Sequence, residues 1–152
     1  MSIAKKRSFK KENFGHFHPS GSLGKNLSPV SDIMMRGKEL PIVNENCSVY
    51  DVIIQISTKR LGCALVINKN SKIVGFCSDG DLSRFMKKSK NFIGKKARDM
   101  MSKQPTTISE STLIIDALKL MNEKKITVLV IEKNKKIRGL IHMHDIISFL
   151  GI

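Results

Sequence analysis

The feature that most constrains this chain is an internal repeat. The stretch Ile73–Met86 is written again as Ile137–Leu150, and Asp81 in the first copy corresponds to Asp145, 64 residues later. A repeat of this kind indicates two copies of one supersecondary unit that share a fold. Each copy begins as a short apolar strand and continues as a helix with apolar residues at i, i+3 and i+4. The sequence therefore predicts two related halves, each with an aspartate where its last strand turns into a helix.

The repeat extends toward the N-terminus of each half. Apolar residues mark one face of two predicted helices, over residues 49–56 and 114–121. Each helix is followed by an apolar run that predicts a buried strand, Cys63–Ile67 or Thr127–Ile131, and then by a polar turn. Each half is therefore predicted to run strand, helix, strand, strand, helix.

Shorter elements complete the two halves. Short strands are predicted at Ile42–Val43 and Thr107–Ile108, each after a proline, and short helices at Val30–Met35 and Ala97–Met101. Helix N-caps favour small hydroxyl or carboxyl side chains that accept a hydrogen bond from the first turn. The predicted caps of the short first helix and of the two long helices are hydroxyl residues: Ser31, Ser48, and Ser111 or Thr112.

Composition narrows the class of protein. The 152 residues suit one domain built from two halves, and an apolar fraction of 41% with no tryptophan predicts an aliphatic core. No apolar run is long enough to span a bilayer, so we expect no membrane partner. An odd number of cysteines without metal-ligand spacing indicates buried thiols in a reducing compartment, and hence a cytoplasmic protein. These are Cys47, Cys63 and Cys77.

The net charge of +14 raises the question of nucleic acid. Basic residues gather in Lys5–Lys11 and in Lys87–Arg98, and the second cluster contains no acidic residue. The sequence has no zinc-finger spacing, aromatic stacking motif or recognition-helix pattern, so we expect solvated lysines and no nucleic-acid partner. A positive field of this size also favours small anionic ligands such as nucleotides or sugar phosphates.

The two halves end in versions of one phrase: Gly75-x-x-Ser78-x-x-Asp81 and Gly139-x-x-His142-x-x-Asp145. A tandem β-α-β-β-α unit ending in Gly-x-x-Ser/Thr-x-x-Asp resembles a pair of cystathionine β-synthase (CBS) domains. The resemblance implies an α/β (α+β) fold with two β-α-β-β-α CBS repeats related by a pseudo-twofold axis. The expected divisions are an arm over 1–29, a first CBS domain over 30–88 and a second over 97–152.

A second resemblance concerns the leader, which carries the phrase His18-Pro19-Ser20-Gly21-Ser22-Leu23-Gly24. It is similar to the His-Pro-Gly-Gly-x-Leu-Gly signature of bacterial arabinose-5-phosphate isomerases, at the joint between their sugar-isomerase domain and CBS pair. The resemblance implies a catalytic role for His18 toward that domain, although Ser20 replaces a glycine. Those enzymes interconvert arabinose 5-phosphate and ribulose 5-phosphate in the synthesis of Kdo, a sugar of lipopolysaccharide.

The sugar-isomerase domain itself has no counterpart in the sequence. Aldose–ketose isomerisation needs a phosphate cradle, a base and a walled cavity, and the family's hydroxyl-rich phosphate loop is not found. We therefore expect a truncated or split C-terminal part of such an isomerase, not catalytic alone. The alternative is a functional part of the isomerase whose catalytic domain is on a separate chain.

Candidate ligand-binding residues lie at the strand ends. A carboxylate there suits the two hydroxyls of a ribose, and the adjacent helix N-terminus offers N–H groups to a phosphate. The alternative for Ser78-x-x-Asp81 is an ordinary capping box, which is compatible with ribose binding through a free carboxylate oxygen. The candidate ligand-binding residues are Ser78, Asp81, His142, Asp145, Val43 and Ile108.

Two histidines precede the second aspartate. His142 and His144 could ligate a metal, but side chains at i and i+2 are expected to diverge at a helix start, and no further ligand is evident. We therefore expect no metal site and no cofactor. His142 stands at the place of Ser78 and would donate to a phosphate better when protonated, below a pKa of about 6.5.

The resemblance also predicts partners. It implies a regulatory module that senses a nucleotide or nucleotide-sugar, either an adenine nucleotide or CMP-Kdo, in a cleft between the halves. Paired CBS units resemble discs that dimerise, so a homodimer through the CBS pair is expected. A separate sugar-isomerase chain is a further possible partner.

Overall fold

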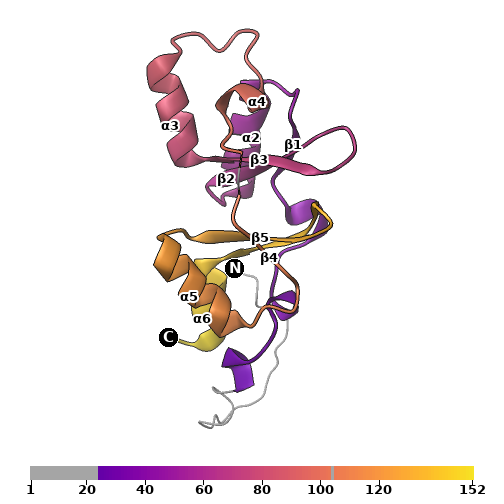
Figure 1. The fold of residues 1–152 in the computed structure, drawn as a ribbon. Coiled ribbons are helices and arrows are strands. Elements are labelled where there is room, and N and C mark those ends of the chain that lie inside the picture. The colour runs from indigo at the N-terminus through magenta and orange to yellow at the C-terminus, as the bar shows by residue number, and fades with distance from the viewer. Residues whose placement is uncertain (1–23, 104) are drawn as a thin grey trace. The chain divides into compact units, whose positions relative to one another are not determined.

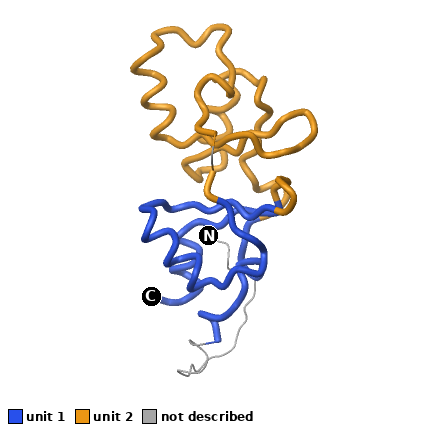
Figure 2. The backbone as a smooth tube through the Cα atoms, in the orientation of Figure 1, with its two compact units in different colours: residues 1–35, 107–132, 138–152 blue, residues 36–106, 133–137 orange. Residues whose placement is uncertain are grey.

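The fold is that of a computed structural model, in which residues 24–103 and 105–152 are described. The chain divides into two compact units (Figure 2). Of the described residues, unit 1 contains 24–35, 107–132 and 138–152, and unit 2 contains the others. Each unit is a three-stranded mixed sheet with helices, which confirms the predicted α/β (α+β) class.

Unit 2 is built around a sheet with the strand order β1-β2-β3 (Figure 1). Strand β1 is parallel to β2, and β2 is antiparallel to β3, with an irregularity between Val66 and Ile67. The elements of unit 2 are η4 (Gly37–Glu39), β1 (Ile42–Asn44), α2 (Val49–Lys59), β2 (Cys63–Ile67), β3 (Ile73–Ser78), α3 (Asp79–Lys88) and α4 (Ala97–Met100).

Unit 1 repeats this plan with the strand order β4-β5-β6, and β4 is parallel to β5. Figure 1 shows α5 and α6 on one side of this sheet. The end of β5, the start of β6 and the turn between them, residues 133–137, are grouped with unit 2. The elements are η3 (Val30–Asp32), β4 (Thr107–Ile108), α5 (Ile114–Lys124), β5 (Val128–Lys133), β6 (Lys136–His142) and α6 (Met143–Leu150).

Each unit has an aliphatic core, as the composition predicts. The apolar stripes of α2 and α5 face their sheets because their apolar residues recur at helical spacing. The core of unit 2 is formed by Val43, Val49, Val52, Ile56, Ala64, Val66, Cys77, Ala97 and Met100. The core of unit 1 is formed by Val30, Met34, Ile114, Ala117, Met121, Leu129, Ile131, Ile141 and Ile146.

The short leading helix of each repeat packs with the strands of the other repeat. Val30 and Met34, at the start of the first repeat, belong to the core of unit 1. Ala97 and Met100, at the start of the second repeat, belong to the core of unit 2. The compact units therefore do not coincide with the two sequence repeats.

Gly75 and Gly139 lie where another segment of the same unit crosses the last strand. A Cβ at position 75 would come within 2.9 Å of the carbonyl oxygen of Ser102, and one at position 139 within 2.7 Å of that of Met35. The crossing segments form isolated antiparallel bridges with the strands: Phe76 with Ser102, and Met35 with Leu140. The recurring glycine thus makes room for backbone.

The expected helix caps are correct in one case out of three. Ser48 caps α2, because its Oγ accepts a hydrogen bond from the N–H of Asp51 at 3.1 Å. The caps Ser31, and Ser111 or Thr112, are wrong. Ser31 lies inside the 3-10 helix η3, which begins after Pro29, and the N-cap of α5 is Leu113.

Helix α5 begins at least one residue later than expected, so its N-cap position is Leu113, whose side chain has no hydrogen-bond acceptor. A long-range backbone contact satisfies its first amide. The N–H of Ile114 donates to the carbonyl oxygen of Ser28 at 2.8 Å, so a residue far back in the sequence satisfies the first amide of this helix. In unit 2 the N–H of Val49 donates in the same way to the carbonyl oxygen of Lys95, at 3.2 Å.

The cysteines are free thiols. Cys63 and Cys77 are buried, as predicted, and Cys47 is half-buried. Burial raises the pKa of the Cys63 and Cys77 thiols to about 12, with nearby carboxylates adding to the effect. Both thiols are therefore uncharged and unreactive in the folded protein. Among the described residues, no helix is long and apolar enough to cross a bilayer.

Candidate functional site

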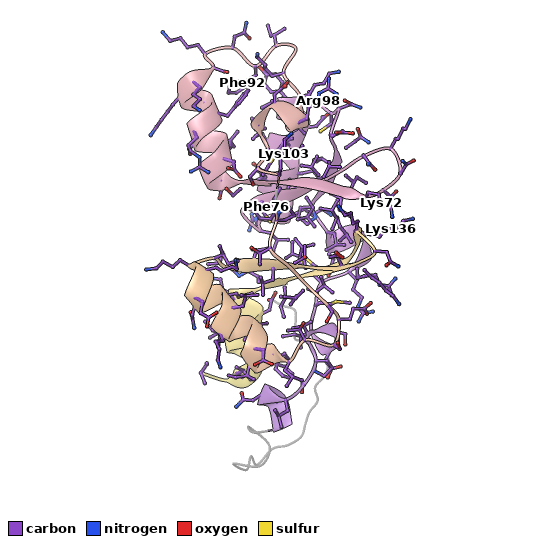
Figure 3. All side chains as sticks on the ribbon, in the orientation of Figure 1. Lys72, Phe76, Phe92, Arg98, Lys103 and Lys136 are labelled. Carbon is purple, nitrogen blue, oxygen red and sulfur yellow. The ribbon has the colours of Figure 1, made fainter. Side chains whose placement is uncertain are left out.

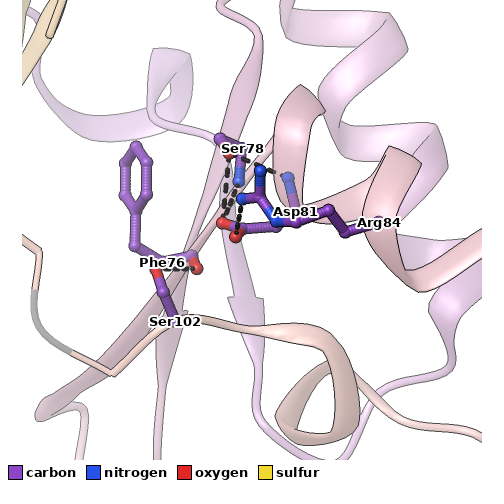
Figure 4. A network of polar contacts seen from close by, with 5 residues as sticks. All are labelled: Phe76, Ser78, Asp81, Arg84 and Ser102. Carbon is purple, nitrogen blue, oxygen red and sulfur yellow. Dashed lines mark hydrogen bonds and ion pairs between the residues drawn. The ribbon is translucent and has the colours of Figure 1, made fainter. Parts of the chain in front are cut away.

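The first strand end joins β3 to α3 through a complete capping box (Figure 4). Ser78 is the N-cap and has an extended backbone, with φ −96° and ψ 170°. The N–H of Asp81 donates to Ser78 Oγ at 3.1 Å, and the N–H of Ser78 donates to Asp81 Oδ2 at 2.9 Å. The predicted pairing of these two side chains is therefore present, in its capping form.

The carboxylate of Asp81 has two further partners. The hydroxyl of Ser78 donates to Oδ2 at 3.1 Å, and Arg84 Nη2 donates to Oδ1 at 2.7 Å (Figure 4). The side chain of Asp81 is 14% exposed, whereas that of Arg84 is 68% exposed. A carboxylate offers about four acceptor positions. Asp81 uses three of them within unit 2, so little capacity is left for a ligand.

Arg84 is a residue that our sequence reasoning missed. Its signal was present, because Asp81 and Arg84 are oppositely charged and three residues apart on a helix, a spacing that brings side chains together. The repeat supplies a second clue. The residue that corresponds to Arg84 in the second copy, 64 positions later, is Ser148, which carries no charge.

The second strand end joins β6 to α6, with His142 as N-cap. His142 Nδ1 accepts a hydrogen bond from the N–H of His144 at 3.0 Å. The two imidazole rings stack, with centroids 4.9 Å apart and planes 5° from parallel. The expectation that these side chains diverge is wrong, because His142 has an extended backbone outside the helix (φ −103°, ψ 146°) and directs its ring back over the first turn.

The surroundings of His142 favour its neutral imidazole. Burial lowers the pKa of its imidazole below the usual 6.5, the charge of His144 lowers it further, and Asp145 acts in the opposite direction. An accepting Nδ1 belongs to the neutral ring, and protonation removes that acceptor. The gain in phosphate binding expected on protonation is therefore shifted to lower pH and is accompanied by loss of the cap.

Asp145 differs from Asp81 in its surroundings. It is half-buried in the first turn of α6. Within the described part of the chain, its carboxylate forms no hydrogen bond and no ion pair, although it acts electrostatically on His142. Its acceptor positions are therefore available at a helix N-terminus, where N–H groups favour negative groups of a ligand.

The two apolar candidates lie in the first strands of the sheets. Val43 is 7% exposed and pairs with Val66, whereas Ser78 pairs with Cys63, three residues earlier in β2. The sheet therefore places Val43 two strands away from Ser78, in the core. Ile108 is half-buried, pairs with Ile131 and packs against the core of unit 1.

The remaining expectations concern metals and charge. Over residues 24–103 and 105–152, no group of three or more His, Cys, Asp or Glu side chains could hold a metal ion. His18 and the rest of its phrase up to Leu23 lie outside the described residues. The lysines of the predicted basic cluster Lys87–Arg98 are mostly exposed. Unit 2 also brings Lys72 and Lys136 together in an antiparallel bridge (Figure 3).

Comparison with known proteins identifies the family of the chain. The CBS domain family matches residues 30–88 and 97–152. The chain belongs to the CBS domain family. This confirms the predicted tandem CBS repeats, so Asp81 and Asp145 are equivalent residues of two CBS domains.

The relatives of this CBS pair include sugar-phosphate isomerases. The Yersinia pestis arabinose 5-phosphate isomerase KdsD is 33% identical over 148 residues, which are 97% of this chain and 45% of that protein. The Francisella tularensis KdsD is 35% identical over 97% of this chain and 46% of its own length. The chain thus spans about half the length of these curated relatives.

Among solved structures, CBSX2 in complex with AMP is 27% identical, with a TM-score of 0.70 over 80% of this chain and 94% of that chain. The CBS domain of a bacterial CNNM/CorC family Mg²⁺ transporter in complex with ATP is 18% identical, with a TM-score of 0.72 over 87% and 94% of the two chains. The second likeness concerns the fold alone.

Proposed function

We propose that this CBS pair is a ligand-binding regulatory module that takes up a nucleotide at the strand end between β6 and α6. The observation that carries the proposal is the carboxylate of Asp145, half-buried at a helix N-terminus without a hydrogen bond or ion pair to the described residues. The predicted function as a regulatory CBS module agrees with the family to which the chain belongs.

The chemistry of this strand end suits a ribose phosphate. The two hydroxyls of a ribose can donate to the two oxygens of Asp145. Hydrogen bonds to a charged group of this kind contribute about 1.5–3 kcal/mol to the binding free energy. The first N–H groups of α6 and the net charge of +14 favour the phosphate. Because the related CBSX2 is described in complex with AMP, an adenine nucleotide is favoured over CMP-Kdo as the ligand.

Calorimetry with AMP, ATP, CMP and CMP-Kdo tests this proposal. Replacement Asp145→Asn should weaken binding of the preferred nucleotide about tenfold to a hundredfold. The matched control is Asp116→Asn, which removes the same charge from the first turn of α5 in the same unit. Equal losses in the two variants would point to general electrostatics, and no binding to the wild-type chain would refute the proposal.

A second candidate function follows from the likeness to KdsD. In this alternative the chain is a functional part of an arabinose-5-phosphate isomerase in Kdo and lipopolysaccharide synthesis, with catalysis supplied by a sugar-isomerase domain on another chain. The purified chain should then convert no arabinose 5-phosphate to ribulose 5-phosphate alone, and should do so only with that domain present. Turnover by the chain alone that is abolished in His18→Ala would contradict both arrangements.

We also propose a homodimer in the cytoplasm. The outer face of α2 exposes Tyr50 and Ile54, with 54% and 58% of their surfaces accessible. The outer face of α5 carries a shallow apolar groove lined by Ile115 and Leu118. Exposed apolar helix faces of this kind are typical of protein interfaces. Light scattering should give twice the mass of the chain, and Ile54→Asp should reduce it if α2 forms the contact.

A further inference from the structure

The two strand ends differ at two of three equivalent positions, on either side of an aspartate that both keep. In the first, a serine caps the helix, and an arginine one turn later holds the aspartate. In the second, a histidine caps the helix with its own ring nitrogen, and the position of the arginine is taken by a serine. The corresponding residues are Ser78, Asp81 and Arg84 in the first copy, and His142, Asp145 and Ser148 in the second.

The number of free acceptor positions on the aspartate carboxylate decides whether it can bind a ribose. Binding of a cis-diol to a carboxylate requires two acceptor positions, preferably one on each oxygen. At Asp81, Oδ2 already accepts from the Ser78 N–H and hydroxyl, at 2.9 and 3.1 Å, and Oδ1 accepts from Arg84 at 2.7 Å. One position remains for a diol. If Arg84 moves away, both positions of Oδ1 become available.

We propose that Arg84 is a specificity-determining residue that keeps the first CBS domain closed to ribose, so that a nucleotide binds first at Asp145. This inference rests on the proposed nucleotide-binding function. Arg84 acts as an internal substitute for the ligand's hydroxyl donors, and it also neutralises the charge of Asp81. Asp145 has no such cation among the described residues.

The ion pair between Arg84 and Asp81 closes the first site to ribose only partly, because Arg84 is exposed. Its side chain is 68% accessible, and exposed ion pairs contribute little to stability because water screens them. The closure should therefore weaken ribose binding at Asp81 about threefold to fivefold, without abolishing it. A guanidinium also binds phosphate well, so a nucleotide at high concentration can draw Arg84 away from Asp81. The module would then fill its two domains in order.

Calorimetry with AMP on four chains tests the inference: the wild type, Asp145→Asn, Asp145→Asn with Arg84→Ser, and Asp145→Asn with Arg98→Ser. Serine at position 84 reproduces the residue of the second copy. Arg98 is an exposed arginine of the same unit whose guanidinium contacts Asn46 instead. We expect Arg84→Ser to strengthen the residual binding of Asp145→Asn about threefold to fivefold, and Arg98→Ser to leave it equal or slightly weaker.

The outcomes separate the two proposals. If the wild-type chain binds no AMP, the nucleotide function is refuted and this inference with it. If the wild type binds AMP and Asp145→Asn binds it equally well, the proposed site at Asp145 is refuted together with the inference. If Asp145→Asn weakens binding but Arg84→Ser then leaves the residual binding unchanged or weakens it, only the inference is overturned. Should a double variant fail to fold, amide NMR of the wild type decides: AMP should shift the amides of residues 143–146 at lower concentration than those of 79–82, and the reverse order overturns the inference.

Discussion

Among single residues, Gly75 and Gly139 have the clearest role in packing. At both positions a Cβ would meet a backbone carbonyl oxygen of the crossing segment, which cannot move aside as a flexible side chain can. Gly75 and Gly139 therefore belong to the packing of the units, although they stand in the same phrase as the candidate ligand residues.

Replacement Gly75→Ala or Gly139→Ala should destabilise the chain by about 1–3 kcal/mol, the usual cost of inserting a methyl group into a packed region. Urea denaturation followed by circular dichroism measures this. The matched control is Gly80→Ala in α3, where the nearest atom to a Cβ is the flexible end of Arg84 at 3.4 Å. That substitution should be neutral or slightly stabilising. Equal effects at positions 75 and 80 would refute the packing role.

His142 should make stability depend on pH on the acid side. Because its pKa is lowered in the folded state, the unfolded chain binds the proton more readily. Its contribution is therefore complete above about pH 6.5 and is lost as the pH falls through the lowered folded pKa. Replacement His142→Ser, which restores the residue of the first copy, should reduce the fall in Tm between pH 7 and pH 5.

The control for this experiment is His144→Ser. This substitution keeps the backbone N–H of residue 144, which donates to His142 Nδ1. It removes the charge of His144, which lowers the pKa of His142 less than burial does, so most of the pH dependence should remain. If His142→Ser leaves the pH dependence of Tm unchanged, the lowered pKa of His142 is not its origin.

At the scale of elements, α2 and α5 occupy equivalent places but begin differently. Ser48 caps α2 with its side chain, whereas the N-cap of α5, Leu113, forms no side-chain hydrogen bond to the described residues. Replacement Ser48→Ala should cost about 1 kcal/mol of unfolding free energy. Ser111→Ala should cost much less, since the hydroxyl of Ser111 forms a hydrogen bond only with Ser109 among the described residues. Similar losses at both positions in chemical denaturation would contradict this difference.

These elements also show how much of the fold could be predicted from the sequence. The strands Cys63–Ile67 and Thr107–Ile108 have the predicted bounds because their apolar runs end at polar or proline-marked turns. The cap of α5 was predicted wrongly because the helix begins after Leu113, and its first N–H is satisfied by Ser28, a residue more than eighty positions away. Local pattern indicates where a helix forms, while the partner of its first amide depends on segments far away in the sequence.

The candidate site shows the same limit at closer range. The repeat identified Asp81 and Asp145 as equivalent, and the capping box of Ser78 was predicted as one of two compatible roles. The pattern could not show that one carboxylate is held by an arginine while the other is open. That difference depends on side-chain geometry, which the spacing of Arg84 only hinted at.

For the whole molecule, the exchanged leading helices make each unit depend on both sequence repeats. A fragment of residues 30–88 lacks Ala97 and Met100, which lie in the core of unit 2. A fragment of residues 36–106 retains them. The fragment 36–106 should unfold more cooperatively and at a higher Tm than the fragment 30–88, as measured by circular dichroism. If the fragment 30–88 is equally stable, the leading helix of the second repeat contributes nothing to that core.

The central claim is that a nucleotide binds this CBS pair at the N-terminus of α6 through Asp145. A crystal structure of the chain grown with AMP tests it most directly. The claim predicts both ribose hydroxyls within hydrogen-bond distance of the Asp145 carboxylate, with Arg84 still paired to Asp81 at low ligand concentration. A ribose bound at Asp81 with Asp145 unoccupied, or AMP remote from both strand ends, would contradict it.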